Sequence, residues 1–196
     1  MNRNCVITLL FSSIFFINTA PWGSRILSAG VVCFPDLIEC SINRAIGFLA
    51  NEQLNWGEFA TYSSDKKDMS SSKYTHSVFI TTFVLHSLNY IEKTKIVKDM
   101  IDRAVNYLLD NKEGIGLWRF FGKGSYIYPD MDDISCALAA LYQHDIPIEP
   151  DLPEYFLQFR NKKSNLFYTW LKEPLTKGND IDCIVNANTP VSYTHL

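Results

Sequence analysis

An internal repeat is the feature that most restricts how this chain can fold. A shift of 50 residues places Arg160–Leu171 (RNKKSNLFYTWL) over Asp110–Phe121 (DNKEGIGLWRFF). A shift of 59 residues places an earlier segment, Ala45–Tyr62, over Ala104–Phe121, with a glycine and an aromatic residue at matching positions. Self-similarity at such periods is typical of proteins built from stacked copies of one supersecondary unit.

The first half of each copy is predicted to be a helix that ends in an aromatic turn. In Lys95–Asn111, charged residues occupy one face. Apolar residues recur with the helical period on the other face: Ile96, Val97, Met100, Ile101, Ala104, Val105 and Leu108. A helix of this kind covers a core on one side and meets water on the other.

The second half of each copy is a helix that is apolar nearly all round. Val78–Leu88 reads VFITTFVLHSL, and Ile134–Tyr142 reads ISCALAALY. A helix without a polar face belongs inside the protein. Outer amphipathic helices that alternate with inner apolar ones predict an all-α fold over residues 35–190, a partial α/α toroid of repeated helix pairs. Three copies are too few to close such a ring, so we expect the chain to be truncated at its C-terminus.

Both ends of the chain differ from the repeats. Residues 1–34 begin with an apolar run behind Arg3, which fits either a secretory signal or a start codon assigned too far upstream. Because the run is short for a membrane span, we expect a cytoplasmic protein, with secretion or membrane anchoring through residues 1–20 as the alternative. The last six residues, 191–196 (VSYTHL), match one reading frame of a sequencing adaptor and are expected to be an artefact.

Charge and cysteine content argue against several classes of function. The net charge of −3 is too small to predict a nucleic-acid partner. The five cysteines are odd in number and include no CxxC pair, which argues against a disulfide framework or a zinc knuckle. The histidines have no ligand spacing. We therefore expect free, buried thiols, no metal and no cofactor.

Acidic residues cluster immediately before two of the inner helices. Asp130, Asp132 and Asp133 precede the apolar run of the second copy, and the shift of 50 residues brings Asp180 and Asp182 to matching positions. One interpretation is structural, because acids at the start of a helix cap free N–H groups and suit the helix dipole. The other is catalytic, because burial and crowding raise a carboxyl pKa and let the acid protonate a weak base.

The string DMDD (Asp130–Asp133) resembles the DxDD motif of class II terpenoid cyclases, in which the middle acid protonates an alkene or epoxide. The resemblance implies that Asp132 is the catalytic acid and that Asp130 and Asp133 tune it. PDMDDISCALAAL, NLFYTWL and NDIDCIVNAN also resemble bacterial single-toroid prenyltransferase and squalene oxidase repeat proteins, over roughly residues 40–189.

These resemblances imply acid-initiated cyclisation of an isoprenoid. The partner would be a hydrophobic isoprenoid-like small molecule, and no further cofactor is implied. The residues expected to contact this substrate are Trp118, Tyr128, Asp180, Asp182 and Asn186.

Two other functions fit the same pattern. Repeated helix pairs form concave surfaces, which can bind a ligand or a protein without catalysis. Paired acids beside exposed rings also serve carbohydrate-active enzymes, and the candidate rings are Trp118, Tyr126, Tyr128, Tyr168 and Trp170. Recurrence of these rings in the repeat equally fits packing. Asn186 and Asn188 either line an inner surface or form hydrogen bonds between inner helices.

Overall fold

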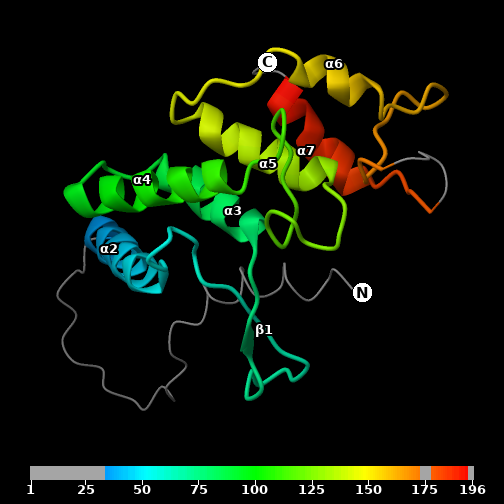
Figure 1. Cartoon of the computed structure of the whole chain (residues 1–196). Helices are drawn as coiled ribbons and strands as arrows, with labels where there is room; N and C mark the ends of the chain where they lie inside the picture. The colour runs from blue at the N-terminus through cyan, green and yellow to red at the C-terminus, as the bar shows by residue number, and fades with distance from the viewer. Residues whose placement is uncertain (1–33, 173–177, 194–196) are drawn as a thin grey trace, which may run out of the picture.

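The order of the helices follows the predicted pairs (Figure 1). The computed structural model describes residues 34–172 and 178–193. Within these residues the fold is mainly helical, with one small hairpin. The helices in chain order are α2 (Phe34–Glu52), α3 (Val78–Leu88), α4 (Lys95–Asp110), α5 (Met131–Tyr142), α6 (Leu152–Leu157) and α7 (Cys183–Tyr193). Below, α2 with α3, α4 with α5 and α6 with α7 are called the first, second and third pairs.

A turn closed by an isolated β-bridge follows the first helix of each pair. The bridges join Gln53 with Phe59, Glu113 with Leu117, and Arg160 with Phe167. The turns therefore fall after α2, α4 and α6, where the sequence repeat places its aromatic residues.

The second helix of each pair begins beside a polar side chain that accepts a backbone N–H. Oγ of Ser77 accepts from Ile80 at 3.4 Å, Oδ1 of Asp130 from Asp133 at 2.8 Å, and Oδ1 of Asp182 from Ile184 at 2.7 Å. Such contacts satisfy N–H groups that a helix leaves without partners at its start.

At each junction between successive pairs, the first residue of a helix donates a backbone hydrogen bond to the next pair. The first residue of α3, Val78, donates to the carbonyl of Phe120 at 3.0 Å, and the first residue of α5, Met131, donates to Thr169 at 2.9 Å. We call these contacts the first joint (Val78 with Phe120) and the second joint (Met131 with Thr169). Each joint places the start of an inner helix against the segment that follows the bridged turn of the next pair.

The inner helices pack against one another. α3 contacts α5, α5 contacts α7, and α4 packs on both α2 and α3. α3 is buried along most of its length, as its uniformly apolar sequence predicts. α4 buries the predicted apolar face with one exception, because Ile96 stays 46% exposed. The buried face extends instead to Tyr107, whose ring packs edge-on against His76.

A short antiparallel hairpin projects from the helices between α2 and α3 (Figure 1). Strand β1 (Tyr62–Ser63) pairs with strand β2 (Lys73–Tyr74), with Tyr62 opposite Tyr74. From its sequence, Ser63–Lys73 is predicted to be a polar loop without a strand signal. Strands of two residues are too short to leave a periodic pattern, which is why the sequence does not predict them.

Some expectations concern residues outside those that the structure describes. They are the apolar segment 1–34 apart from Phe34, and positions 194–196 of the predicted artefact. Among the helices of the described ranges, none is long and apolar enough to cross a membrane. Cys40, Cys136 and Cys183 are free thiols, but Cys40 and Cys183 are exposed, so the prediction that the thiols are buried is wrong for these two.

Replacing Gly57 with alanine should destabilise the fold by about 3 kcal/mol. Gly57 has a φ of +99°, and an added Cβ would lie 2.1 Å from the carbonyl oxygen of Arg103 on α4. Backbone strain and overlap with a helix carbonyl therefore oppose the change together.

Gly114→Ala is the matched control for this substitution. Gly114 also has a positive φ, +52°, but nothing lies within 4 Å of its added Cβ. We expect it to cost about 1 kcal/mol from backbone strain alone. Urea denaturation measures both variants, and equal losses would show that the Arg103 contact is unimportant.

Candidate active site

Asp130 caps helix α5. Its backbone is extended, with φ −125° and ψ 157°, and its Oδ1 accepts the N–H of Asp133 at 2.8 Å. Only 3% of the residue is exposed, and its backbone pairs with Trp170 in an isolated bridge. The capping interpretation is therefore confirmed for Asp130. A buried cap at this point also fixes where the two acids that follow it lie.

Asp132 and Asp133 occupy the first turn of α5 but have different surroundings. Asp133 is 1% exposed, whereas Asp132 is partly exposed. Nδ2 of Asn188, on α7, donates to Oδ1 of Asp132 at 2.7 Å. Successive residues of a helix project in different directions. Asp132 is consequently the one acid of these three that a molecule outside the protein can reach.

Asn188 and Asn186 take different roles on α7. Asn188 forms a hydrogen bond between two inner helices, which is one of the two roles that the sequence predicts for it. Asn186 bonds to the turn of its own pair, where its Oδ1 accepts from Phe167 N at 2.7 Å and its Nδ2 donates to Phe167 O at 2.9 Å. In the first pair, Oγ1 of Thr81 likewise accepts from Phe59 N at 3.2 Å. This recurrence indicates a structural role for Asn186, and its contact with a substrate stays a prediction.

The third pair also has an aspartate cap, but at the position that matches Asp132 rather than Asp130. Oδ1 of Asp182 accepts from the backbone N–H of Ile184 at 2.7 Å at the start of α7. Asp180 is exposed, and its backbone carbonyl accepts from Thr169 N at 2.9 Å. Cys183 stands where the second pair has the buried acid Asp133. The second pair therefore places three carboxyl groups at a helix start, and the third pair places two.

The two aromatic residues predicted to contact substrate lie in different environments. Trp118 is 1% exposed, and its Nε1 donates to the carbonyl of Leu108 at 2.8 Å. A ring enclosed in this way serves packing and has no surface to offer a ligand. Tyr128 is 53% exposed, with Nζ of Lys172 5.8 Å from its ring centre. Tyr128 is thus the predicted aromatic contact that stays accessible.

The three acids also act on Cys136, which follows Asp132 by one helical turn. Burial raises the pKa of the Cys136 thiol, and the negative charges of Asp132, Asp133 and Asp130 raise it further. A thiol that stays protonated is a poor nucleophile. At this helix start the carboxyl groups, and not the thiol of Cys136, are therefore the candidates for a chemical role.

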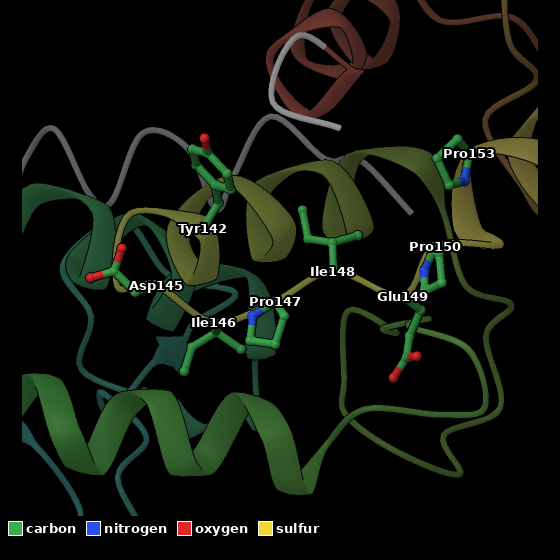
Figure 2. A pocket seen from close by; sticks show the side chains of 8 residues that line it. All are labelled: Tyr142, Asp145, Ile146, Pro147, Ile148, Glu149, Pro150 and Pro153. Atoms are coloured by element: carbon green, nitrogen blue, oxygen red, sulfur yellow. The ribbon is translucent and has the colours of Figure 1, made fainter.

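A groove lies at the other end of α5 (Figure 2). Its volume is about 540 Å³, and its walls come from the end of α5, the proline-rich connector and the start of α6. The lining residues are Tyr142, Asp145, Ile146, Pro147, Ile148, Glu149, Pro150 and Pro153. A helix of 12 residues is about 18 Å long. The groove is consequently remote from Asp132, and none of the predicted site residues lines it.

Neither a metal centre nor a known relative guides the assignment further. Within residues 34–172 and 178–193, no group of three His, Cys, Asp or Glu side chains is arranged to hold a metal ion. No protein family, curated protein or solved structure matches the chain. Any functional interpretation therefore depends on the contacts described above.

One cluster of polar residues is not anticipated by the sequence. Glu58 is fully buried beside His76, although 17 residues and the hairpin separate them along the chain. The available signal is weak: a glutamate directly between Gly57 and Phe59, the glycine and the aromatic residue that recur in the repeat. This cluster is separate from the acids of α5 and is taken up below.

Replacing Asp130 with alanine should lower the free energy of unfolding by about 1–2 kcal/mol, because α5 loses its cap. Asp130→Asn keeps an acceptor oxygen and should cost less than half as much. Asp180→Ala removes an exposed acid and should change stability by about 0.5 kcal/mol or less. Urea denaturation compares the three variants, and a stable Asp130→Ala protein would contradict the assignment of the cap.

Proposed function

We propose that the helix pairs are repeats of an α/α toroid and that the protein is terpenoid cyclase-like, with Asp132 as the acid that starts cyclisation of an isoprenoid. The observation that carries this proposal is the division of roles in DMDD. Asp130 is committed to capping and Asp133 is buried, whereas Asp132 is partly exposed and bonded to Asn188. This arrangement supports the middle acid as the group that meets a substrate.

The hydrogen bond from Asn188 favours a defined proton position on Asp132. An amide N–H that donates to Oδ1 leaves the proton of the acid form on Oδ2. Protonation of an alkene then breaks the Oδ2–H bond, forms a C–H bond and leaves a carbocation and a carboxylate. The same amide N–H donates more strongly to the carboxylate than to the neutral acid. Asn188 therefore stabilises the charge that develops on Asp132, which is how a fixed donor lowers a barrier.

A second candidate function is ligand binding without catalysis. It is favoured by the structural roles of several residues expected to act on a substrate. Asp130 and Asp182 accept helix N–H groups, and Trp118 fills the core. In that case the contact between Asp132 and Asn188 would simply join α5 to α7.

The two candidates differ in what Asp132→Asn does. The purified full chain would be incubated with polyprenyl diphosphates, squalene and epoxysqualene in heavy water. A cyclase should form products that carry one deuterium, because the acid delivers a solvent-derived proton. Asp132→Asn should lower the rate at least about a hundredfold, since the amide has no acidic proton to transfer.

Asp102→Asn is the control, because it changes an exposed acid on α4 in the same way. It should leave the rate unchanged, and circular dichroism should show all three proteins folded. Equal turnover by Asp132→Asn and the parent would contradict the acid role. Isoprenoid binding without turnover, unchanged in both variants, would favour the second candidate.

A further inference from the structure

Glu58 is the centre of a polar cluster between the first and second pairs. Its side chain is fully buried and accepts hydrogen bonds from Trp56 Nε1 at 3.0 Å, Tyr74 OH at 2.6 Å and Ser77 N at 2.8 Å. His76 Nδ1 lies 3.0 Å from the same carboxyl group. A buried carboxylate is tolerated when donors surround it in this way. Burial by itself raises the pKa of Glu58, but its hydrogen bonds, led by that from His76, together bring the pKa below its usual value.

His76 is held on both sides of its ring. Nδ1 faces Glu58, and Nε2 lies 3.2 Å from the hydroxyl of Tyr107 on α4. The side chain of Asn111, the residue directly after α4, forms a further hydrogen bond to the histidine. Backbone of the second pair closes over the ring at Gly122, where an added Cβ would lie 2.2 Å from Nε2. The imidazole therefore lies between two helix pairs.

The partners of His76 favour its protonated form. Both ring nitrogens are donors only when the imidazole carries a positive charge. The hydrogen bond to Glu58 raises the pKa of His76, burial opposes this, and the negative charge of Glu58 and the bond to Asn111 raise it further. The other titratable groups that face the ring are Tyr74 and Tyr107. Burial raises the pKa of both phenols, so they stay neutral.

We propose that Glu58, Tyr74, His76 and Tyr107 form a pH-responsive clamp between the first and second pairs, closed while His76 is protonated. Glu58 belongs to the turn after α2, Tyr74 to strand β2, His76 to the approach to α3, and Tyr107 to α4. Loss of the proton removes the positive charge beside a fully buried carboxylate. The clamp then holds the hairpin and α4 less tightly, because an uncompensated buried charge is costly.

The pH range in which the clamp is closed follows from the directions in which the pKa values of His76 and Glu58 are shifted. A histidine with a raised pKa adds stability that is complete below its ordinary value of 6.5 and is lost as the pH rises through the raised value. A glutamate with a lowered pKa adds stability that is present above its ordinary value of 4.5 and is lost as the pH falls through the lowered value. The clamp is therefore tightest between these two ordinary values and opens on the alkaline side by losing the proton of His76.

The first test is an NMR titration of the histidine ring signals in the folded full chain. His76 should titrate above its ordinary value of 6.5, because its Nδ1 lies 3.0 Å from the buried carboxyl group of Glu58. His76→Gln assigns the His76 signals by their loss, and His86→Gln serves as a control because it removes a histidine whose ring packs on Tyr90. A His76 that titrates at or below 6.5 would overturn the proposal.

The second test compares urea midpoints of the parent chain and of His76→Gln from pH 5.5 to 9. The parent should exceed the variant most at the acid end, and the difference should shrink as the pH rises. At pH 6 the amides of residues 58–77 should exchange faster in His76→Gln than in the parent, and this increase should be larger than the increase for the amides of α5. His86→Gln should follow the parent at every pH, and a pH-independent difference for His76→Gln would contradict the clamp. If Glu58→Gln folds, its urea midpoints can be compared over the same pH range. The titration of His76 tests the proposal even if Glu58→Gln does not fold.

Discussion

The two joints are the constraint on which the rest of the structure depends. At each one, the first backbone N–H of an inner helix donates to a carbonyl of the following pair, and a polar side chain caps the same helix start. A helix begins with several N–H groups that lack internal partners, so a buried helix start must find acceptors nearby. The repeat supplies these acceptors from the segment that follows each bridged turn. These backbone contacts consequently fix the positions of the inner helices α3 and α5, and with them the positions of the side chains at the helix starts.

This constraint explains why the cluster DMDD divides its roles. The cap position must be buried and must accept an N–H, which commits Asp130. Successive residues of a helix project in different directions. The next acids consequently meet different surroundings, and Asp132 meets Asn188 of α7. A functional acid can therefore occur within a structural cap without replacing it. In the third pair the residue that matches Asp132, Asp182, is itself the one that accepts a helix N–H, and a cysteine occupies the place of the second buried acid.

Features that depend on local periodicity could be predicted from the sequence, and features that depend on long-range contacts could not. The apolar period of α4 and the uniform burial of α3 follow from helix geometry, and so does the cap at Asp130. Ile96 is the exception on α4, because periodicity assigns a face but not its edges. The specific pairing of Asp132 with Asn188, 56 residues further along the chain, depends on how α5 and α7 meet, which no local pattern encodes. The toroid itself is a longer-range feature still and stays a prediction.

The cluster around Glu58 depends on long-range contacts for the same reason. The donors to Glu58 come from the turn after α2, from strand β2 and from the residues just before α3, and Tyr107 of α4 contacts His76, so no single segment of the sequence contains the pattern. Strand β2 brings Tyr74 to the carboxylate. A two-stranded hairpin is marginal by itself, and contacts to a buried charge give it a fixed place. Hairpin and clamp therefore depend on each other.

The joints also differ in the residue directly before the cap, and this difference separates the clamp from the acid site. His76 precedes Ser77 at the first joint, and Pro129 precedes Asp130 at the second. Pro129 cannot titrate, and its carbonyl accepts the backbone N–H of Leu171 at 2.9 Å. The second joint is therefore held by backbone contacts that do not change with pH. Loss of the proton from His76 can loosen the contact between the first and second pairs while the start of α5, with its acids, keeps its position.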